Sequence, residues 1–388
     1  MTKIKVLFVV AGFYRAGAER FAYELDRVLD KEKFDLTIFC LEKVKDINPV
    51  WKIRYYEDLH KQLGTKIKYA DEFIDYRYTE QGRIRNKIKK YLGLFPKNPS
   101  FWNEDLSNYL DEFDVIHWMG EYIYINSVSD SVRKKSLIYT MTARFQKRTL
   151  YDNFNHELYY NFCTGFKKEE LKYELEQFKN YHSVFVPLFM KIDEKKRRWK
   201  FQNSSIKKIG IFTRLDPFKP LDPFFYSFQL LLDRLPNCEL HIFGNGDPIQ
   251  TGMTQSLERI GMQDKVFFRG HQEDITDTAI DEKLDLSWFQ GYNNDRPAGY
   301  AGFDICTTGV PLLCWDFKPN PNEYKNPVYP HYKNLNQFVA KTIEILTDQN
   351  KAEDLSEKQY NDVLKTRSAV NHIKTIEAEY ERIFNLKY

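Results

Sequence analysis

The sequence predicts an α/β fold built from two Rossmann-like domains. Three observations lead to this prediction. The chain has 388 residues, a length at which two domains are the natural expectation. An apolar run, a glycine-containing loop and a helical pattern follow one another at the start of the chain, and the same order recurs at 284–315. A charged segment near residue 200 separates the two halves, and the strand pattern begins again after it.

Composition excludes several classes of protein. The net charge of +3 arises from 58 basic and 55 acidic residues, so the chain has no strong nucleic-acid signature. Its 5 cysteines are odd in number and include no C-x-x-C pair, which favours reduced thiols in a cytosol. No apolar run is long enough to cross a bilayer, and Lys3–Lys5 leads straight into a strand pattern with no signal peptide. We therefore expect a cytoplasmic protein, either soluble or peripheral at the inner face of the membrane.

The first strand and helix are predicted at the start of the chain. Ile4–Val10 is a nearly continuous apolar run, as in a parallel strand buried on both faces. A loop ending at Gly17 follows, and then apolar residues recur with the helical period at positions 18, 21, 22, 25, 28 and 29. The loop lacks a G-x-G-x-x-G pattern, so dinucleotide binding gains little support. Taken alone, the loop is better explained as an ordinary turn between strand and helix.

Further strands are predicted along the first half, at Phe34–Leu41, Lys66–Ala70, Asp114–Trp118, Leu137–Met141 and Ser183–Val186. His117 would lie near the carboxyl end of its strand, at the edge where α/β sheets bind ligands. An imidazole at such a place can bond a substrate hydroxyl or help to move a proton. The alternative is a structural histidine whose polar atoms are satisfied within the fold.

A basic segment, Arg83–Leu92, has Ile84, Ile88 and Leu92 at helical spacing. Two interpretations stay open. The helix could lie on an anionic membrane surface, with its cations near the lipid headgroups. Alternatively, it could be a solvated helix that packs one thin apolar stripe against the protein.

The second half begins after the polar stretch Lys191–Ser205, which we interpret as an interdomain linker. A strand at Lys207–Thr213 then opens a second α/β domain. We therefore expect domains at 1–200 and 205–370, followed by a last helix at 371–388. More strands are predicted at Cys238–Phe243 and Val266–Phe268, and an amphipathic helix at 335–346.

The loop after the first strand of this half contains Arg214 and Lys219. An arginine offers a planar fork of donors and a lysine a point charge, and both suit a negatively charged ligand. Two solvated cations in a proline-rich loop are the alternative.

The segment 284–315 contains the clearest candidate for phosphate binding. The apolar run Leu284–Phe289 precedes a polar loop, a helix is expected from near Gly299 to Gly309, and Pro311–Trp315 is a second strand. The helix N-terminus would offer unpaired N–H groups and a partial positive charge to a phosphate. Asp304 would lie about one turn inside, within reach of a ribose. An ordinary βαβ unit with a solvated loop remains the alternative.

Several of these motifs resemble those of retaining glycosyltransferases of family 4, which have the GT-B fold. Asp304–Pro311 (DICTTGVP) resembles the family block E-A-M-A-x-G-x-P, and Thr213–Pro220 resembles G-R-L-x-x-x-K-G. The Gly17 loop resembles the family's G-G-x-E-R loop, and Asp114–Trp118 resembles its D-V-V-H-x-H strand end. The resemblance implies two Rossmann-like domains facing each other across a cleft. It also implies that the last helix crosses back to the first domain.

The resemblance implies the transfer of a sugar, with retention, from a UDP- or GDP-sugar to a glycan, lipid-linked or other acceptor in polysaccharide or glycoconjugate biosynthesis. In that family Arg214 and Lys219 would stabilise the leaving diphosphate, Asp304 would hold the ribose, and His117 would orient the sugar or the acceptor. The family's earlier glutamate is replaced here by Arg296, so either Asp295 or Arg296 would contact the donor sugar. The donor-binding set is completed by Gly17, Gly299 and Tyr300.

No cofactor or metal is expected. The chain contains no Asp-x-Asp pair to hold a divalent cation and no clustered Cys/His site. Arg214, Lys219 and the helix at Gly299 would neutralise the diphosphate instead. Two other functions stay open, namely a catalytically inactive binding or scaffold subunit with the GT-B fold, and a sugar-nucleotide epimerase or hydrolase on the same fold.

Overall fold

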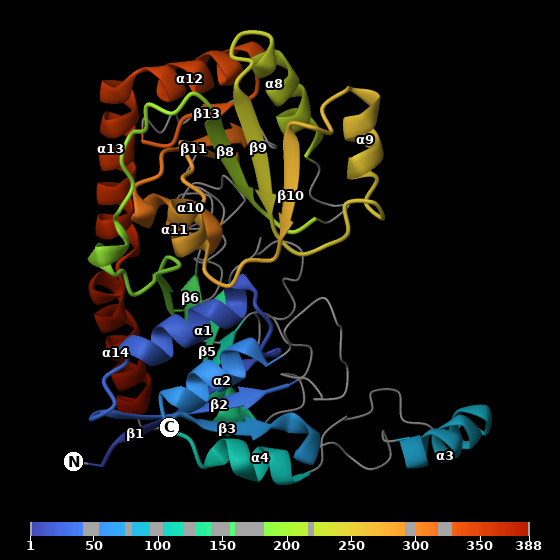
Figure 1. The fold of residues 1–388 in the computed structure, drawn as a ribbon. Coiled ribbons are helices and arrows are strands. Elements are labelled where there is room, and N and C mark those ends of the chain that lie inside the picture. Colours follow the sequence, from blue (N-terminus) through green and yellow to red (C-terminus); the bar gives the residue numbers. More distant parts are fainter. Residues whose placement is uncertain are drawn as a thin grey trace. The chain divides into compact units, whose positions relative to one another are not determined.

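The computed structural model describes residues 2–41, 54–73, 80–93, 104–119, 129–140, 156–159, 182–215, 221–291, 299–316 and 328–386. The chain divides into two compact units (Figure 1). Unit 1 comprises Met1–Lys191 together with Ala369–Tyr388, and unit 2 comprises Ile192–Ser368.

Unit 1 is built on a parallel sheet whose described strands follow the order β3-β2-β1-β4-β5-β6-β7. The strands are β1 (Ile4–Val10), β2 (Phe34–Cys40), β3 (Lys66–Tyr69), β4 (Val115–Met119), β5 (Ser136–Thr140), β6 (His156–Tyr159) and β7 (His182–Phe185). Its helices are α1 (Gly17–Val28), α2 (Tyr55–Gln62), α3 (Glu80–Tyr91), α4 (Glu104–Asp111), α5 (Asp130–Lys134) and α14 (Ala369–Asn385), with a short 3₁₀ turn η1 (Ala70–Phe73).

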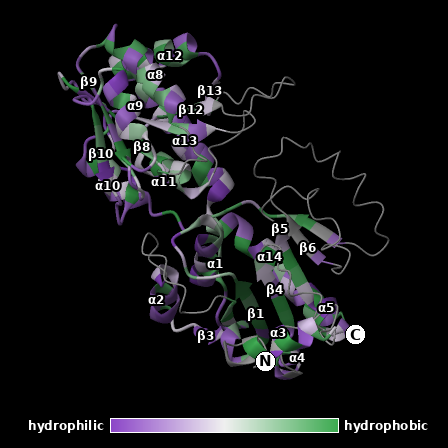
Figure 2. Cartoon of the chain, turned by 90° about the vertical axis from the view of Figure 1, so that its right-hand side faces the viewer, coloured by the Kyte–Doolittle hydropathy of each residue, from purple (hydrophilic) through white to green (hydrophobic). Residues whose placement is uncertain are grey.

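The core of unit 1 follows from the alternation of side chains along the strands. Leu7 and Ile116 face the helix α4, where Leu110 is fully buried. On the opposite face, the ring of Phe21 from α1 stacks on Tyr139 of β5, with centroids 4.3 Å apart. Because the sheet is covered on both faces, its central strands are mostly hydrophobic (Figure 2).

The last helix, α14, belongs to unit 1, although unit 2 lies between them in the sequence. It packs on α1, β1 and β4. Its Glu377 accepts a hydrogen bond from the backbone N–H of Asp30 at 3.0 Å. The backbone N–H of Ala369 donates to the carbonyl of Met190 at 2.9 Å. The start of the helix is therefore bonded to the end of the first segment of unit 1, Met1–Lys191.

Unit 2 has a second parallel sheet, whose described strands follow the order β10-β9-β8-β11-β12-β13. The strands are β8 (Lys207–Phe212), β9 (Cys238–Phe243), β10 (Val266–Gly270), β11 (Leu286–Gly291), β12 (Leu312–Asp316) and β13 (His331–Tyr332). The helices are α8 (Asp222–Leu232), α9 (Met253–Arg259), α10 (Ile275–Asp281), α11 (Tyr300–Thr308), α12 (Leu335–Thr347) and α13 (Gln349–Arg367), and η5 (Glu194–Lys196) is a 3₁₀ turn.

An aromatic cluster holds two helices of unit 2 against its sheet. Trp288 of β11 is fully buried between Phe224 of α8 and Phe338 of α12, with ring centroids 6.0 Å and 5.0 Å away. The indole nitrogen of Trp288 donates to the hydroxyl of Thr342 at 3.1 Å. Large apolar side chains in the middle of β11 therefore fix α8 and α12 on one face of the sheet.

The segment expected to be a linker is instead part of unit 2. The backbone N–H groups of Arg198 and Trp199 both donate to the carbonyl of Thr308, at 3.1 and 3.0 Å. Lys196 and Arg198 also form ion pairs with Asp277, at 2.7 and 2.5 Å. Charge and polarity predicted a solvated linker here, but each of these groups has a specific partner.

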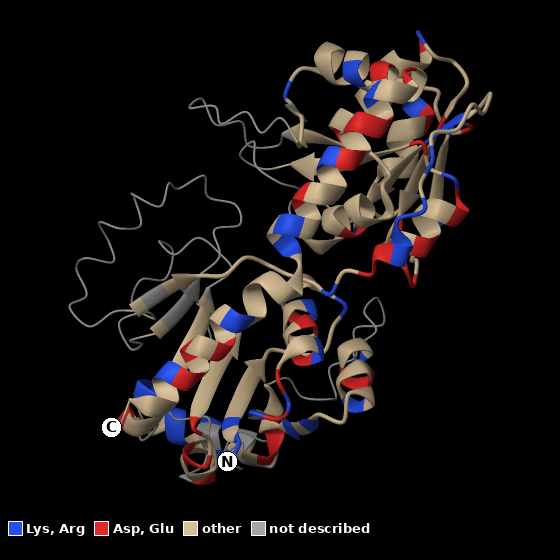
Figure 3. Cartoon of the chain, turned by 90° about the vertical axis from the view of Figure 1, so that its left-hand side faces the viewer, with Lys and Arg blue, Asp and Glu red and all other residues tan. Residues whose placement is uncertain are grey.

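Acidic and basic residues are interspersed along the helices of both units (Figure 3). Among the described helices, none is long and apolar enough to span a bilayer.

Candidate functional site

The candidate site lies at the carboxyl edge of the sheet of unit 2. The chain order of the strands reverses between β8 and β11, and doubly wound sheets bind ligands outside the carboxyl ends of the strands at such a switch point. β8 pairs with β9 over its full length, but with β11 only at Ile209↔Leu286 and Gly210↔Ser287. The two strands therefore separate toward their carboxyl ends.

Arg214 is held at this edge by two close-fitting loops. The N–H of Thr213 donates to the carbonyl of Phe243 at 2.9 Å, and the N–H of Leu215 donates to the carbonyl of Asn245 at 2.8 Å. These bonds continue the pairing of β8 and β9 beyond both strands. Arg214 lies between the two bonded residues, with its side chain exposed.

Two glycines make this approach possible. A Cβ atom on Gly244 would overlap the carbonyl oxygen of Thr213, and a Cβ on Gly246 would lie 2.5 Å from the carbonyl oxygen of Leu215. Only glycine avoids both clashes, because these carbonyl oxygens belong to the backbone and cannot move independently. The Gly244-x-Gly246 pattern thus positions Arg214 indirectly.

We expect Gly244→Ala to lower the free energy of unfolding by about 2–3 kcal/mol, because the added methyl group must push the two loops apart. Urea unfolding measures this loss. Gly252→Ala is the control, since Gly252 has a φ of 74° but no atom within 4 Å of the position that a Cβ would occupy. Gly252→Ala should lower the free energy of unfolding by only about 1 kcal/mol. Equal losses in both variants would contradict a structural role for the close approach.

The helix α11 provides the second part of the edge. Gly299 is its N-cap with a φ of 91° and no side-chain capping bond, and Tyr300 is its first residue. Gly299 itself therefore supplies no side chain to cap the first N–H groups of the helix. Asp304 lies on the second turn and is only 5% exposed. The bounds of α11 agree with the helix that the sequence predicted between Gly299 and Gly309.

Three of the expected site residues, Lys219, Asp295 and Arg296, lie outside the described residues. In unit 1, Gly17 opens α1 as expected. The preceding loop lies beside α2, where the N–H of Tyr56 donates to the carbonyl of Phe13 at 3.2 Å and the guanidinium of Arg15 stacks 4.6 Å above the ring of Tyr55.

His117 occupies a different position from the one expected. It has no exposed surface, and its Nδ1 lies 2.6 Å from the hydroxyl of Tyr380 on α14. Phe8 packs against the ring at a centroid distance of 4.4 Å. Burial lowers the pKa of His117 to about 3, so the imidazole is neutral at physiological pH. The sequence placed His117 at the sheet edge, but α14 covers it, and no pattern near residue 117 could reveal a partner from the end of the chain.

Sequence reasoning missed Gln290, the penultimate residue of β11. It is 7% exposed, and its amide nitrogen is buried without a hydrogen-bond partner in the described structure. The only signal in the sequence is a polar residue inside an apolar strand, directly before the polar loop.

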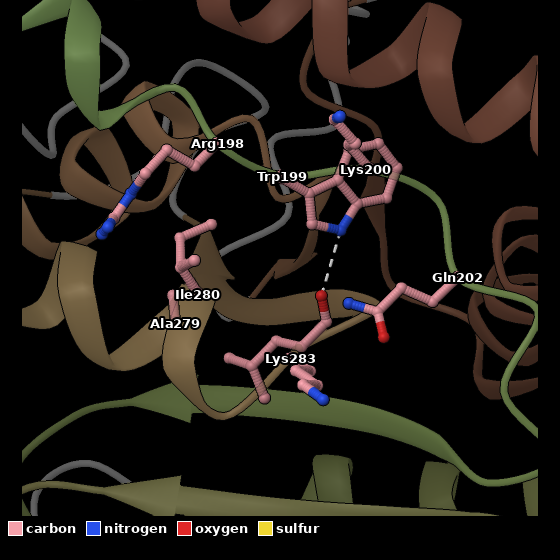
Figure 4. A pocket seen from close by; sticks show the side chains of 8 residues that line it. Arg198, Trp199, Lys200, Gln202, Ala279, Ile280 and Lys283 are labelled. Atoms are coloured by element: carbon pink, nitrogen blue, oxygen red, sulfur yellow. Dashed lines mark hydrogen bonds between the residues drawn. The ribbon is translucent and has the colours of Figure 1, made fainter.

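A cavity of about 270 Å³ lies elsewhere in unit 2 (Figure 4). It is lined by the end of α10, by Leu284 before β11, and by Trp199, whose indole nitrogen donates to the carbonyl of Leu284 at 3.0 Å. These segments lie at the amino edge of the sheet, so the cavity is distinct from the edge that carries Arg214. In the described part of the chain, no three His, Cys, Asp or Glu side chains are grouped to hold a metal ion.

Comparison with solved structures shows similarity over almost the whole chain. Anabaena HepE in complex with UDP and glucose has a TM-score of 0.66 at 12% identity, covering 97% of this chain and 99% of that chain. A glycosyltransferase from Rickettsia africae has a TM-score of 0.68 at 12% identity, covering 100% of both chains. A mutant of S. aureus TarM in complex with Fondaparinux, alpha-GlcNAc-glycerol and UDP has a TM-score of 0.64 at 12% identity, covering 99% of this chain and 100% of that chain.

No family model matches the chain, and no curated protein matches it by sequence. At 12% identity the likeness to solved structures is a likeness of fold. It confirms the fold class predicted from the sequence, and the chain has the GT-B fold of the glycosyltransferases that it resembles in structure.

Proposed function

We propose that the protein is a glycosyltransferase that moves a sugar from a nucleotide-sugar, a UDP- or GDP-sugar, to a glycan or lipid-linked acceptor. The observation that carries this proposal is the carboxyl edge of unit 2, where Arg214 follows β8 and the N-terminus of α11 follows β11. Both features suit a diphosphate. Support also comes from the similar fold of HepE, which was solved with UDP-glucose, and of the pneumococcal O-GlcNAc transferase GtfA, which was solved with UDP and GlcNAc.

The reaction that we propose proceeds with retention and without a metal. The bond between the anomeric carbon and the diphosphate oxygen breaks while the acceptor oxygen bonds to the same face of that carbon. The acceptor proton passes to the departing phosphate. Arg214 and Lys219 stabilise the charge on the leaving group. Asp304 holds the ribose, Asp295 or Arg296 contacts the sugar, and the donor-binding set is completed by Gly17, Gly299 and Tyr300.

His117 has a different role in this proposal. A neutral imidazole with no exposed surface, bonded to Tyr380, fixes α14 on the sheet of unit 1. We assign it to the positioning of unit 1 rather than to contact with the donor or the acceptor.

Release of nucleotide from a panel of UDP-, GDP-, ADP- and dTDP-sugars, with and without candidate acceptors, tests the proposal. Release that requires an acceptor and is abolished by Lys219→Ala supports a transferase. Release without an acceptor favours the hydrolase, and interconversion of the sugar favours the epimerase. Binding without turnover favours the inactive binding subunit. This alternative is considered because Arg296 replaces the family's glutamate. Parallel assays with a chelator test the expected independence from metal.

We further propose that α3 contacts an anionic membrane surface. Its apolar residues do not pack against the protein, because Ile84 is 72% exposed and Ile88 is 55% exposed. Leu92, just beyond the helix, is 59% exposed. Lys87 and Lys89 lie on the same helix. A basic helix with exposed apolar side chains suits anionic headgroups.

We expect the protein to co-sediment with phosphatidylglycerol vesicles and not with phosphatidylcholine vesicles, and binding should fall as salt concentration rises. The double substitution Ile84→Ser and Ile88→Ser should abolish binding without loss of stability, since both side chains are already exposed. Equal binding to both kinds of vesicle, or none to either, would refute the membrane contact.

A further inference from the structure

Gln290 combines two features that rarely occur together. It is more than nine-tenths buried, with 7% of its surface exposed, and its side-chain nitrogen has no hydrogen-bond partner among the described residues. Buried amide groups are almost always bonded, because removing an amide from water without a partner is costly. The Nε2 donor of Gln290 is therefore open to a hydrogen-bond acceptor that a ligand supplies.

The position of Gln290 indicates where that partner would lie. Gln290 pairs with Trp315 of β12 and is followed by Gly291, where β11 ends. It thus lies at the carboxyl edge, on the strand that separates from β8. The residual exposure places it at the rim of the core rather than deep within it.

The side chain projects toward α8. Side chains alternate along a strand, so Gln290 shares the face of Trp288. Trp288 packs against Phe224, in the first turn of α8. Gln290 lies about 7 Å closer to the carboxyl edge than Trp288. It therefore lies near the start of α8, the helix that follows the loop of Arg214.

We propose that Gln290 is a further donor-binding residue, whose amide N–H donates a hydrogen bond to an oxygen of the diphosphate of the nucleotide-sugar. This inference rests on the proposed function. The N–H₂ group only donates, and diphosphate oxygens only accept. The amide complements Arg214, because it adds a directed bond without a further charge at the same edge. The bond strengthens as negative charge builds on the leaving group, so it contributes to the rate as well as to binding.

A second buried glutamine in unit 2 provides a matched control. Gln359 has no exposed surface, and its amide is fully bonded. Its Oε1 accepts from the N–H of Leu312 at 2.8 Å, and its Nε2 donates to the carbonyls of Leu312 and Val328 at 2.8 and 3.0 Å. Replacing Gln359 with leucine leaves three backbone groups without partners, whereas replacing Gln290 leaves none.

The experiment compares Gln290→Leu and Gln359→Leu with the wild type by thermal unfolding without ligand and by calorimetric titration with UDP and GDP. For Gln290→Leu we expect an unchanged or higher melting temperature, because a buried unpaired amide is removed. We also expect a dissociation constant about 10- to 100-fold higher for the diphosphate that the wild type binds. Gln359→Leu should instead lower the melting temperature by several degrees.

Each other outcome decides against the proposal in a distinguishable way. If the wild type binds a nucleoside diphosphate and Gln290→Leu binds it equally well, the role of Gln290 is refuted while the proposed function stands. If the wild type binds neither UDP nor GDP, the proposed function fails and the role of Gln290 fails with it. Titration with uridine or guanosine covers the remaining outcome. If Gln290→Leu weakens binding of the nucleoside as much as binding of the nucleoside diphosphate, the amide contacts the nucleoside and the diphosphate contact is refuted.

Discussion

Arg214→Ala is expected to lower the rate of sugar transfer about 10²- to 10³-fold, the usual cost of removing one preorganised donor to a developing charge. The guanidinium is exposed at the edge where β8 and β11 separate, on a loop that two backbone bonds fix in place. In the proposed reaction, a loss of charge at this point would destabilise the leaving diphosphate. Steady-state kinetics with the preferred donor should therefore show a fall in kcat that exceeds the rise in KM.

Two further variants make this prediction specific. Arg214→Lys keeps the charge but loses the planar fork, so an intermediate rate is expected. Arg234→Ala removes an exposed arginine between α8 and β9, at the opposite edge of the sheet, and should leave the rate unchanged. The urea midpoint of Arg214→Ala should equal that of the wild type, because the side chain is exposed. A rate within threefold of wild type would remove Arg214 from the leaving-group role.

Local patterns predicted most of the strands and the helix of the candidate site. β1 and β9 have the bounds that were predicted for them. In β1 the signal is a nearly continuous apolar run, as expected of a strand buried on both faces. The helix α11 lies between the two glycines that were expected to bound it. In each case the residues that form the element also carry the sequence pattern that predicts it.

Features that depend on distant partners were not predicted. β6 pairs with β5 and β7 at the far end of the sheet of unit 1, although its four residues show no clear strand pattern. The segment Lys191–Ser205 was expected to be a linker, but Asp277 and the carbonyl of Thr308 attach its middle part to unit 2. The position of His117 was missed for the same reason, since its partner lies 263 residues further along the chain.

The role of Gly244 and Gly246 shows how sequence and structure complement one another. Taken alone, the pattern Gly244-x-Gly246 predicts only a tight turn. The structure shows that the missing side chains admit the backbone of Thr213 and Leu215, which places Arg214. A substitution in one loop is therefore expected to act on a charged residue in another, an effect that no single motif could reveal.

His117 is expected to make the stability of unit 1 depend on pH. Burial lowers its pKa to about 3, whereas an unfolded histidine titrates near pH 6.5. Between these values the unfolded chain binds the extra proton, so stability is present above pH 6.5 and is lost as pH falls. The loss amounts to about 1.4 kcal/mol per pH unit, or about 2 kcal/mol by pH 5. His156, whose pKa is lowered to about 4 by burial and by Arg382, adds to the same trend.

The double variant His117→Phe with Tyr380→Phe isolates this contribution. It removes the titrating group and leaves no hydroxyl without a partner, so its stability should fall less steeply with acid than that of the wild type. We expect urea unfolding at pH 7.5, 6.5, 5.5 and 5 to show that the wild type loses about 2 kcal/mol more of its free energy of unfolding than the double variant across this range. Tyr380→Phe alone is the control, since it keeps His117 and should keep the full acid dependence.

Kinetics of the same variants at pH 7.5 separate a positioning role from a catalytic one. An imidazole without exposed surface that supports α14 should affect kcat little once the protein is folded, because Tyr380 of α14 covers it. Each destabilised variant is therefore assayed well below its melting temperature. A fall in kcat of more than a hundredfold in a fully folded His117→Phe, Tyr380→Phe protein would show that the histidine reaches the substrate. In that case α14 would have to move away from β4 during the reaction, because it covers the imidazole in the structure.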